Sequence, residues 1–380
     1  MYNPLASYED NLRNGPSPEW NRGGSFPKIR YTSEPRFSCL GFPLHLPLGI
    51  PAGPLLSSSY VNVALDAGFV MPVYKTVRSS AWESHPWPNV LRVDHFMDKN
   101  PQNSIPLAQV LPLQKVILDD ESQRRALSIT NAFGVPSQTP EIWKKDVQSI
   151  SKNSLHDGYM PTLSFQGSRR EGRSWLDFLD DTALCAQLAA NAMQEIGGRC
   201  LEMNVSCPNE AGAPIYTDKV ALEDTLRAAA FGLRDFPNLK LIIKMGIIPE
   251  TDSLSVVELV AKYAHGIAAI NTLSAIIETP DGKRALGSKA EHGGICGDVI
   301  RTVALETIKK LHTARESLGL VSSQFALIGV GGCSSFTHLQ RFLEAGADVV
   351  HAATGAMWNL QLASECALEL GVAFTNEDID

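Results

Sequence analysis

The sequence lacks the features that mark several large classes of protein. It has no run of about 18 consecutive apolar residues, so we expect no segment that crosses a membrane. No basic stretch followed by an apolar one stands at its start, so we expect no secretory signal and a cytoplasmic location. The formal net charge is -8 and Lys and Arg are not clustered, which argues against a nucleic-acid-binding surface.

Cysteine is present but is not spaced for metal binding. The seven cysteines are scattered and never form a Cys-x-x-Cys pair, so neither a zinc ribbon nor an iron–sulfur cluster is indicated. Such a pattern is typical of reduced thiols, and we expect no metal. The 380 residues are 44% hydrophobic and 19% charged, which is the composition of a globular protein with a large core.

From about residue 68, short apolar runs alternate with amphipathic stretches. The runs expected to form strands are 69–77, 126–133, 160–166, 200–207, 239–245, 267–273, 325–330 and 348–354, which makes eight. The stretches between them, such as 175–196 and 299–318, have apolar residues at helical spacing. Strands that alternate with helices pair in parallel, so the pattern predicts an α/β protein with a closed (β/α)8 TIM barrel. The alternative is an open doubly wound sheet, but no Gly-x-Gly-x-x-Gly follows the first strand.

Three segments lie outside this alternation. Residues 1–38 are rich in Pro, Gly, Asn and Ser, and we predict an irregular N-terminal extension whose aromatic residues pack on the body. Residues 39–380 are predicted to be a single barrel domain, in which the apolar segment 40–54 caps the bottom or enters the rim of the site. Residues 78–125 are predicted to be a long insertion after the first barrel strand, and such a connection is usually a lid or an assembly surface.

Polar residues stand at the carboxyl ends of the predicted strands. In a (β/α)8 barrel these ends surround an open mouth in which the chemistry takes place. The residues concerned are Lys75, Asn131, Lys244, Asn271 and Thr272. A lysine that points into such a mouth needs an anion or another polar acceptor, because burying an unpaired charge is costly.

The end of the fourth predicted strand carries the strongest chemical signal. Asn204 and Asn209 each offer two donors and an acceptor, which suits the imide edge of a heterocycle. Cys207 lies between them and is a candidate base or nucleophile, because the reactivity of a thiol depends on its thiolate fraction.

The loops after the last two predicted strands indicate a phosphate site. Gly331 and Gly332 follow the seventh strand, and Ala353 and Thr354 close the eighth. Barrel phosphate sites form from these two loops, and glycine allows the close approach of backbone N–H groups. We therefore predict a ligand that carries a phosphate.

These motifs resemble the dihydroorotate dehydrogenase family, from about residue 40 to the C-terminus. NVSCPNEAGAP at 204–214 is similar to the pattern Asn-x-Ser-Cys-Pro-Asn-x-x-Gly-x-Pro of its soluble, fumarate-using class (class 1A). NAFGVP at 131–136 resembles the family's Asn-Ser-Met-Gly-Leu-Pro, and INT, GGICG and IGVGG resemble its other flavin and substrate segments. The membrane-associated class has serine where this chain has Cys207. One departure is 84–92, where SHPWPNVLR replaces a short basic Gly-Asn-Pro-x-Pro-Arg stretch.

The resemblance implies FMN in the barrel mouth and the oxidation of dihydroorotate to orotate, a step of pyrimidine biosynthesis. It implies that Cys207 removes the C5 proton while C6 delivers hydride to flavin N5. Cofactor contacts are then expected from Ala52, Gly53, Lys75, Lys244, Gly297, Gly331, Gly332, Ala353 and Thr354. Substrate contacts are expected from Lys75, Asn131, Gly134, Val135, Asn204, Asn209, Asn271 and Thr272. The usual assembly of the class is a homodimer.

Other functions stay open at this point. A related flavoenzyme could act on another dihydropyrimidine, and a flavin-free, phosphate-binding lyase or isomerase could use Lys75 or Lys244 as a Schiff base. A barrel kept as a scaffold is disfavoured, because a scaffold has no use for polar groups that converge in a mouth. The electron acceptor is not indicated by the sequence.

Overall fold

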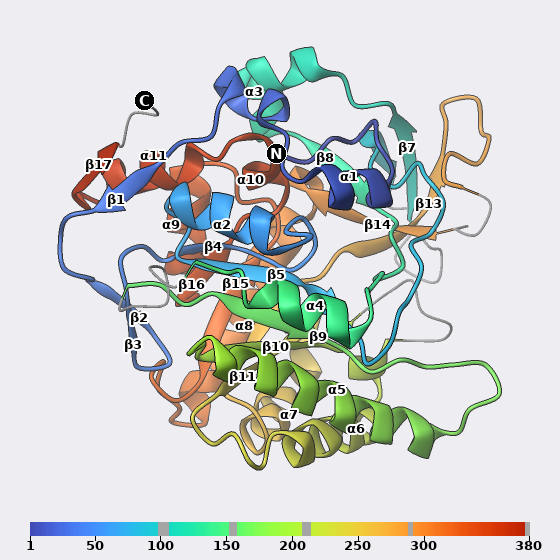
Figure 1. Cartoon of the computed structure of the whole chain (residues 1–380), viewed down its shortest axis with the longest axis vertical. Coiled ribbons are helices and arrows are strands. Elements are labelled where there is room, and N and C mark those ends of the chain that lie inside the picture. The colour runs from blue at the N-terminus through green and yellow to red at the C-terminus, as the bar shows by residue number, and fades with distance from the viewer. Residues whose placement is uncertain (98–105, 152–157, 207–213, 288–291, 377–380) are drawn as a thin grey trace.

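The computed structural model describes residues 1–97, 106–151, 158–206, 214–287 and 292–376 (Figure 1). Its centre is a closed barrel of parallel strands surrounded by helices, so the predicted (β/α)8 class is confirmed. In chain order, which is also their order around the barrel, the strands are β4 (Leu48–Ile50), β5 (Met71–Val77), β9 (Thr162–Phe165), β10 (Cys200–Asn204), β11 (Lys240–Met245), β12 (Gly266–Ala269), β15 (Ala326–Val330) and β16 (Val349–His351).

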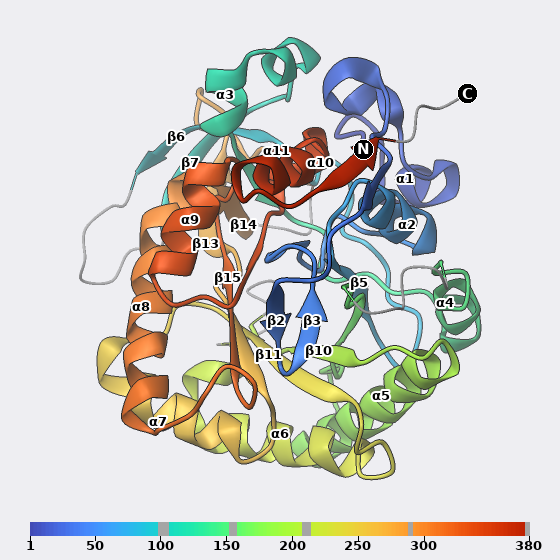
Figure 2. The ribbon, with the colours of Figure 1, turned by 90° about the vertical axis from the view of Figure 1, so that its left-hand side faces the viewer.

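The outer layer consists of helices whose apolar faces pack on the barrel (Figure 2). They are α2 (Ser58–Asp66), α4 (Pro140–Val147), α5 (Trp175–Glu195), α6 (Lys219–Gly232), α7 (Glu250–Ala261), α8 (Arg301–Ser317), α9 (Phe336–Glu344), α10 (Thr354–Trp358) and α11 (Leu362–Glu369). Helix α5 shows why the sequence predicts them well. Ser174 and Asp177 form a reciprocal capping box at its start, and its buried face repeats at the spacing of Phe178, Thr182 and Cys185.

Two of the strand assignments made from the sequence are wrong. The first barrel strand is β4, which comes from segment 40–54, and the run 69–77 provides the second barrel strand, β5. Strand β4 is three residues long and is followed by Pro51, so it is too short to show a periodic pattern. The long insertion therefore follows the second barrel strand rather than the first.

The run 126–133 belongs to a second sheet and not to the barrel. This sheet is a closed set of five strands: β6 (Arg92–Met97), β7 (Leu107–Leu111), β8 (Ser128–Asn131), β13 (Leu273–Glu278) and β14 (His292–Gly297). Its strands lie in the connections that leave the carboxyl ends of β5 and β12, so the sheet stands on the mouth side of the barrel. Strands β7, β8, β13 and β14 lie together on one side of the molecule in Figure 1.

The opposite end of the barrel is covered by a hairpin. Strands β2 (Phe37–Cys39) and β3 (Phe42–Leu44) pair antiparallel and lie in front of the barrel strands in Figure 2. Arg199, which directly precedes β10, stacks on the Phe42 ring at 5.1 Å. The hairpin therefore closes the amino-terminal end of the barrel and leaves the other end for the site.

The N-terminal segment contains more regular structure than the predicted irregular extension. Helix α1 (Tyr8–Asn14) begins after Ser7, whose hydroxyl accepts a hydrogen bond from the amide of Asp10. Strand β1 (Ile29–Tyr31) pairs antiparallel with β17 (Phe374–Asn376). The remaining short helices are η1 (Pro18–Trp20), η2 (Arg22–Gly24), η3 (Lys115–Asp119), α3 (Glu121–Arg125), η5 (Ile215–Thr217) and η6 (Asp298–Ile300).

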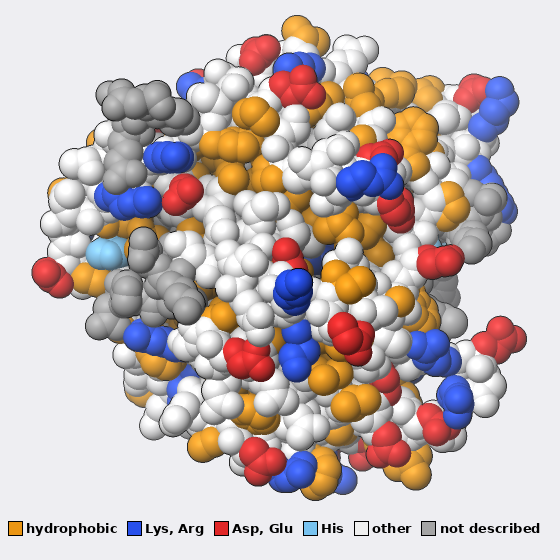
Figure 3. All heavy atoms as spheres, in the orientation of Figure 1, with side chains coloured by type: hydrophobic (Ala, Val, Ile, Leu, Met, Phe, Trp, Pro, Cys, Tyr) orange, Lys and Arg blue, Asp and Glu red, His pale blue; other side chains and the backbone are white. Residues whose placement is uncertain are grey.

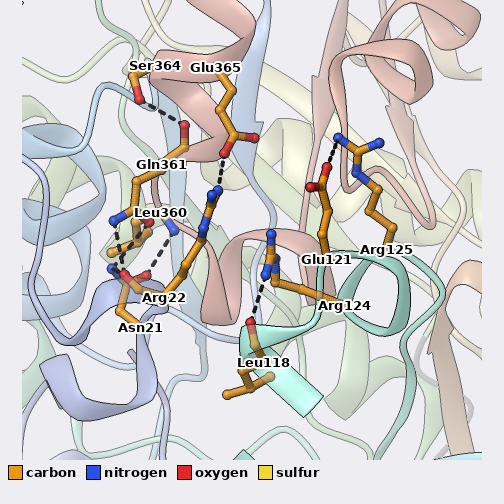
Figure 4. A network of polar contacts seen from close by, with 10 residues as sticks. All are labelled: Asn21, Arg22, Leu118, Glu121, Arg124, Arg125, Leu360, Gln361, Ser364 and Glu365. Atoms are coloured by element: carbon orange, nitrogen blue, oxygen red, sulfur yellow. Dashed lines mark hydrogen bonds and ion pairs between the residues drawn. The ribbon is translucent and has the colours of Figure 1, made fainter. Parts of the chain in front are cut away.

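Polar contacts attach this segment to the chain that follows the eighth barrel strand (Figure 4). The Asn21 side chain accepts a hydrogen bond from the amide of Leu360 at 3.0 Å, and the Gln361 side chain donates to the Arg22 carbonyl at 3.0 Å. Arg22 also forms an ion pair with Glu365 on α11 at 2.5 Å. Residues 20–25 are thus fixed against the helices that border the mouth.

The surface carries mixed charge. On the face shown in Figure 3, Lys and Arg side chains are interspersed with Asp and Glu and form no single basic patch. In the part of the chain that the structure describes, no helix is long and apolar enough to span a bilayer.

Candidate active site

A cavity of about 720 Å³, including its part open to solvent, lies at the mouth of the barrel. Most of the predicted cofactor residues line it, together with three of the predicted substrate residues. Those present are Ala52, Gly53, Asn131, Lys244, Asn271, Thr272, Gly297, Gly331, Gly332, Ala353 and Thr354. They come from the ends of five barrel strands and from the second sheet. The volume is in the range usual for pockets that bind cofactors or small ligands.

A smaller cavity of about 460 Å³ adjoins it. Lys75, Thr76, Val135 and Asn204 line only this one. The two cavities share Ala52, Gly53, Asn131, Phe133, Asn271 and Thr272. The two cavities are thus adjoining compartments with a common wall. The larger one is lined mainly by residues predicted for the cofactor, and the smaller one mainly by residues predicted for the substrate. Lys75, which was predicted for both, lines only the smaller cavity.

Of the predicted site residues that the structure describes, Gly134 alone lines neither cavity. Cys207 and Asn209 lie outside the described residues. Gly134 is described and directly precedes Val135 in the wall of the smaller cavity. Its φ is 73°, and an added Cβ would lie 2.4 Å from Nε2 of His85, so only glycine fits there.

Glycines shape one end of the larger cavity. Gly297 and Gly332 have φ of 101° and 70°. A Cβ added to Gly297 would lie 2.3 Å from the Leu127 carbonyl oxygen, and one added to Gly332 would lie 2.7 Å from the Gly297 carbonyl oxygen. Side chains are therefore excluded here, and the backbone itself forms the wall. Short helix α10 begins at Thr354 beside it. This arrangement of exposed backbone fits a phosphate.

A chain of hydrogen bonds orients the carboxamides of the smaller cavity. Asn204 donates from Nδ2 to Oε1 of Gln166 at 3.0 Å and accepts at Oδ1 from the Ser206 hydroxyl at 3.0 Å. Asn271 donates from Nδ2 to the same Ser206 hydroxyl at 2.9 Å. The buried Ser206 therefore fixes both amides, and it was missed among the predicted site residues. Its place between Asn204 and Cys207 in the motif was the available signal.

Comparison with known proteins identifies the family. The family model for dihydroorotate dehydrogenase matches residues 124–370. A curated dihydroorotate dehydrogenase from Dictyostelium discoideum is 32% identical over 378 residues, covering 96% of this chain and 95% of that protein. The chain belongs to the dihydroorotate dehydrogenase family. It is accordingly an oxidoreductase that acts on CH–CH bonds, in a family of flavoproteins.

Two further similarities agree with this assignment. A putative fumarate-type dihydroorotate dehydrogenase A from Solibacter usitatus is 29% identical over 183 residues, which covers 47% of this chain and 55% of that protein. The crystal structure of a dihydroorotate dehydrogenase from Eimeria tenella in complex with ferulenol superposes with a TM-score of 0.63 at 16% identity, over 88% of this chain and 82% of that one. The structural match supports the barrel fold.

In this dihydroorotate dehydrogenase family member, the barrel interior below the mouth holds buried ionisable groups. Burial lowers the pKa of Lys244, and the nearby Glu202 counteracts this. Burial likewise raises the pKa of Glu202, and Lys244 counteracts that shift. Each group therefore stabilises the charge of the other. Lys244 lines the larger cavity, where it can meet negative charge on a ligand.

Cys296 is a second thiol of the site, which the sequence motifs did not single out. It lines the larger cavity, and burial raises its pKa to about 11. Its Sγ accepts a hydrogen bond from the Thr354 hydroxyl at 3.6 Å. At neutral pH it is a protonated thiol, so it is not suited to act as a base.

Aromatic residues from distant parts of the sequence close the site. Phe133 lines both cavities, and the rings of Tyr2 and Tyr8 lie 5.9 Å from it. Tyr2 itself lines the larger cavity. Segment 84–92, which departs from the family pattern, packs along the same loop, because the amide of His85 donates to the Phe133 carbonyl at 3.0 Å.

Proposed function

We infer that this chain oxidises dihydroorotate to orotate and uses FMN as its cofactor. The observation that carries this proposal is the pair of adjoining cavities in a member of this family. One has a glycine-rich end suited to a phosphate, and the other is lined by amides and a lysine suited to a pyrimidine with a carboxylate.

The residues of the larger cavity fit FMN. The backbone at Gly331, Gly332, Ala353 and Thr354 would hold the phosphate. Ala52, Gly53, Gly297 and Lys244 would lie along the ring system, with Lys244 placed to stabilise negative charge. When bound, FMN supplies the acceptor for the hydride that leaves C6 of the substrate.

The chain's own residues would position the substrate and move the proton. The proposed pyrimidine ligands are Lys75, Asn131, Asn204, Asn209, Asn271 and Thr272, with backbone contacts from Gly134 and Val135. Cys207 would take the C5 proton at its Sγ, and loss of this proton with the C6 hydride leaves the C5=C6 double bond of orotate.

The proposal is tested by an anaerobic titration. Purified protein should be yellow, and dihydroorotate should bleach its flavin absorbance. The same titration with dihydrouracil tests whether another dihydropyrimidine is the substrate. Borohydride trapping of a carbonyl substrate on a flavin-free protein would instead support a lyase or isomerase. Reoxidation of the reduced protein by fumarate, a quinone or oxygen identifies the electron acceptor.

The first prediction concerns the proposed base. Cys207→Ala should keep FMN bound and slow flavin reduction by dihydroorotate by roughly 10²–10⁴-fold in stopped-flow measurements, because the C5 proton loses its acceptor. The matched control is Cys366→Ala, which removes a buried thiol in α11 and should leave the rate unchanged. Equal reduction rates in the Cys207 variant and the wild type would remove this cysteine from the mechanism.

The assembly and its location also belong to the proposal. We propose a homodimer in the cytoplasm, as is usual for the class. Light scattering coupled to size-exclusion chromatography would test the dimer, since the chain has a mass of 41.3 kDa.

A further inference from the structure

Arg78 is a buried cation next to the smaller cavity that has no part in the proposed mechanism. It follows the last residue of β5, the strand that carries Lys75, and its exposed fraction is 0%. A buried guanidinium is costly unless its donors are satisfied, so its hydrogen bonds indicate what it does.

Hydrogen bonds from the Arg78 guanidinium join two loops of the barrel mouth. Nε donates to the Val135 carbonyl at 3.0 Å, and Nη1 donates to the Gly167 carbonyl at 3.3 Å and the Ser168 hydroxyl at 3.1 Å. The guanidinium also lies 4.4 Å from the centre of the Trp82 ring. The cation thus lies among two backbone carbonyls, one hydroxyl and one aromatic face.

The backbone of Arg78 also binds the loop that contains Val135 and Ser137. Its amide donates to the Ser137 hydroxyl at 3.0 Å, and its carbonyl accepts from Nε1 of Trp143 at 3.1 Å. Ser137 and Trp82 exchange two backbone hydrogen bonds of 2.8 and 2.9 Å. Arg78 therefore connects the strand of Lys75 to the loop of Val135, and both Lys75 and Val135 line the smaller cavity.

Val135 shows why such support is needed. Its φ is 52°, in the left-handed region that a β-branched residue rarely adopts. A conformation of this kind is strained and persists only where the surrounding structure imposes it. Arg78 stabilises it, because its Nε donates to the Val135 carbonyl oxygen and so directs that oxygen toward a side chain that lines neither cavity.

We propose that Arg78 is a positioning residue that makes the substrate compartment selective for a ring carrying a carboxylate. With the Val135 carbonyl bonded to Arg78, this oxygen is turned toward the guanidinium and not toward a bound anion. Without Arg78, the carbonyl can turn inward and repel a carboxylate, while a neutral ring is little affected. This inference rests on the proposed function.

The test compares binding of orotate and uracil to the flavin-loaded protein, by isothermal titration and by the change in the flavin spectrum. Arg78→Met should weaken orotate binding about 10–100-fold and change uracil binding less than about threefold. Arg78→Lys keeps the charge but cannot span all three acceptors, and it should recover part of the orotate affinity. Circular dichroism and flavin content report whether each variant folds.

Arg170 offers a matched control. It is exposed and lies 5.5 Å from the same Trp82 ring, but its guanidinium donates to the Ser80 hydroxyl and not to the Val135 loop. Arg170→Met should leave the preference for orotate unchanged.

The outcomes separate the two proposals. If dihydroorotate reduces the wild-type flavin but both Arg78 variants that fold keep the wild-type preference for orotate, the role of Arg78 is overturned and the proposed function stands. If orotate binds in an Arg78-dependent way but dihydroorotate reduces no flavin, the role of Arg78 stands and the proposed function fails. If the wild type does not prefer orotate to uracil, both are overturned.

Discussion

At the scale of single residues, orientation matters as much as identity. The carboxamides of Asn204 and Asn271 can present either a donor or an acceptor to a ligand, and a rotation about the last side-chain bond exchanges the two. Ser206 removes this freedom, because its hydroxyl donates to Asn204 and accepts from Asn271. The amide groups that face the cavity are therefore fixed before a ligand arrives, which lowers the cost of ordering them on binding.

Removing this hydroxyl should weaken substrate binding. We expect Ser206→Ala to raise the dissociation constant of orotate by about tenfold, since two hydrogen bonds of a buried hydroxyl are lost. The FMN content should not change. Spectral titration with orotate gives the value, and Ser364→Ala serves as control because its hydroxyl bonds the Gln361 carbonyl on the segment leading into α11. An unchanged orotate affinity in Ser206→Ala would show that the hydroxyl is not needed, and that the bonds to Gln166 and to the backbone of Ser206 and Thr272 suffice to orient the amides.

At the scale of elements, the N-terminal segment is part of the site. Tyr2 precedes helix α1 and Tyr8 is its first residue, and both pack against Phe133, which lines both cavities. The segment is attached by the ion pair of Arg22 with Glu365 and by the bond from Nε1 of Trp358 to the Tyr2 carbonyl at 3.2 Å. A ligand in the larger cavity therefore buries its surface against a segment that is remote in the sequence.

Cofactor binding should depend on this packing. We expect Tyr2→Ala to weaken FMN binding by about tenfold or more, because it removes a large aromatic surface from the cavity wall. Tyr2→Phe keeps the ring and should bind FMN like the wild type. Equilibrium dialysis or flavin fluorescence measures the constants. Wild-type affinity in Tyr2→Ala would mean that the segment only covers the barrel.

At the scale of the whole molecule, burial of ionisable groups makes stability depend on pH. Burial and the neighbouring Arg301 are the main causes that lower the pKa of His338 to about 4. In the unfolded chain its pKa is about 6.5, so between these values the unfolded state binds a proton that the folded state does not. This histidine therefore lowers stability progressively as the pH falls from about 6.5 to about 4.

The corresponding measurement is urea unfolding at pH 7.5 and pH 5. His338→Gln removes the titrating group, so we expect its loss of unfolding free energy between these pH values to be smaller than that of the wild type. A His338 variant with the full wild-type pH dependence would contradict the assignment.

Much of the architecture follows from local patterns. Helix α5 could be placed within a residue or two because its capping box and its apolar repeat are both local signals. Strands β10 and β11 were recognised because their apolar runs are continuous and bounded. The motif 204–214 and the glycines after the last two strands identified the family. They could be recognised because each consists of residues that are consecutive in the sequence.

The second sheet and the closure of the site were decided only by the tertiary structure. Strand β8 has the same apolar pattern as a barrel strand, and nothing local says that its hydrogen-bond partners are β6 and β14. The same holds for Arg78, whose role depends on Val135, and for Tyr2, which reaches the cavity from the start of the chain. The sequence by itself determined the barrel, the family and the residue types at the strand ends, because periodicity, capping and close backbone approach act over a few residues. Which segments border the two cavities depends on strand pairing and side-chain packing between residues that lie far apart in the sequence. No local pattern determines these interactions.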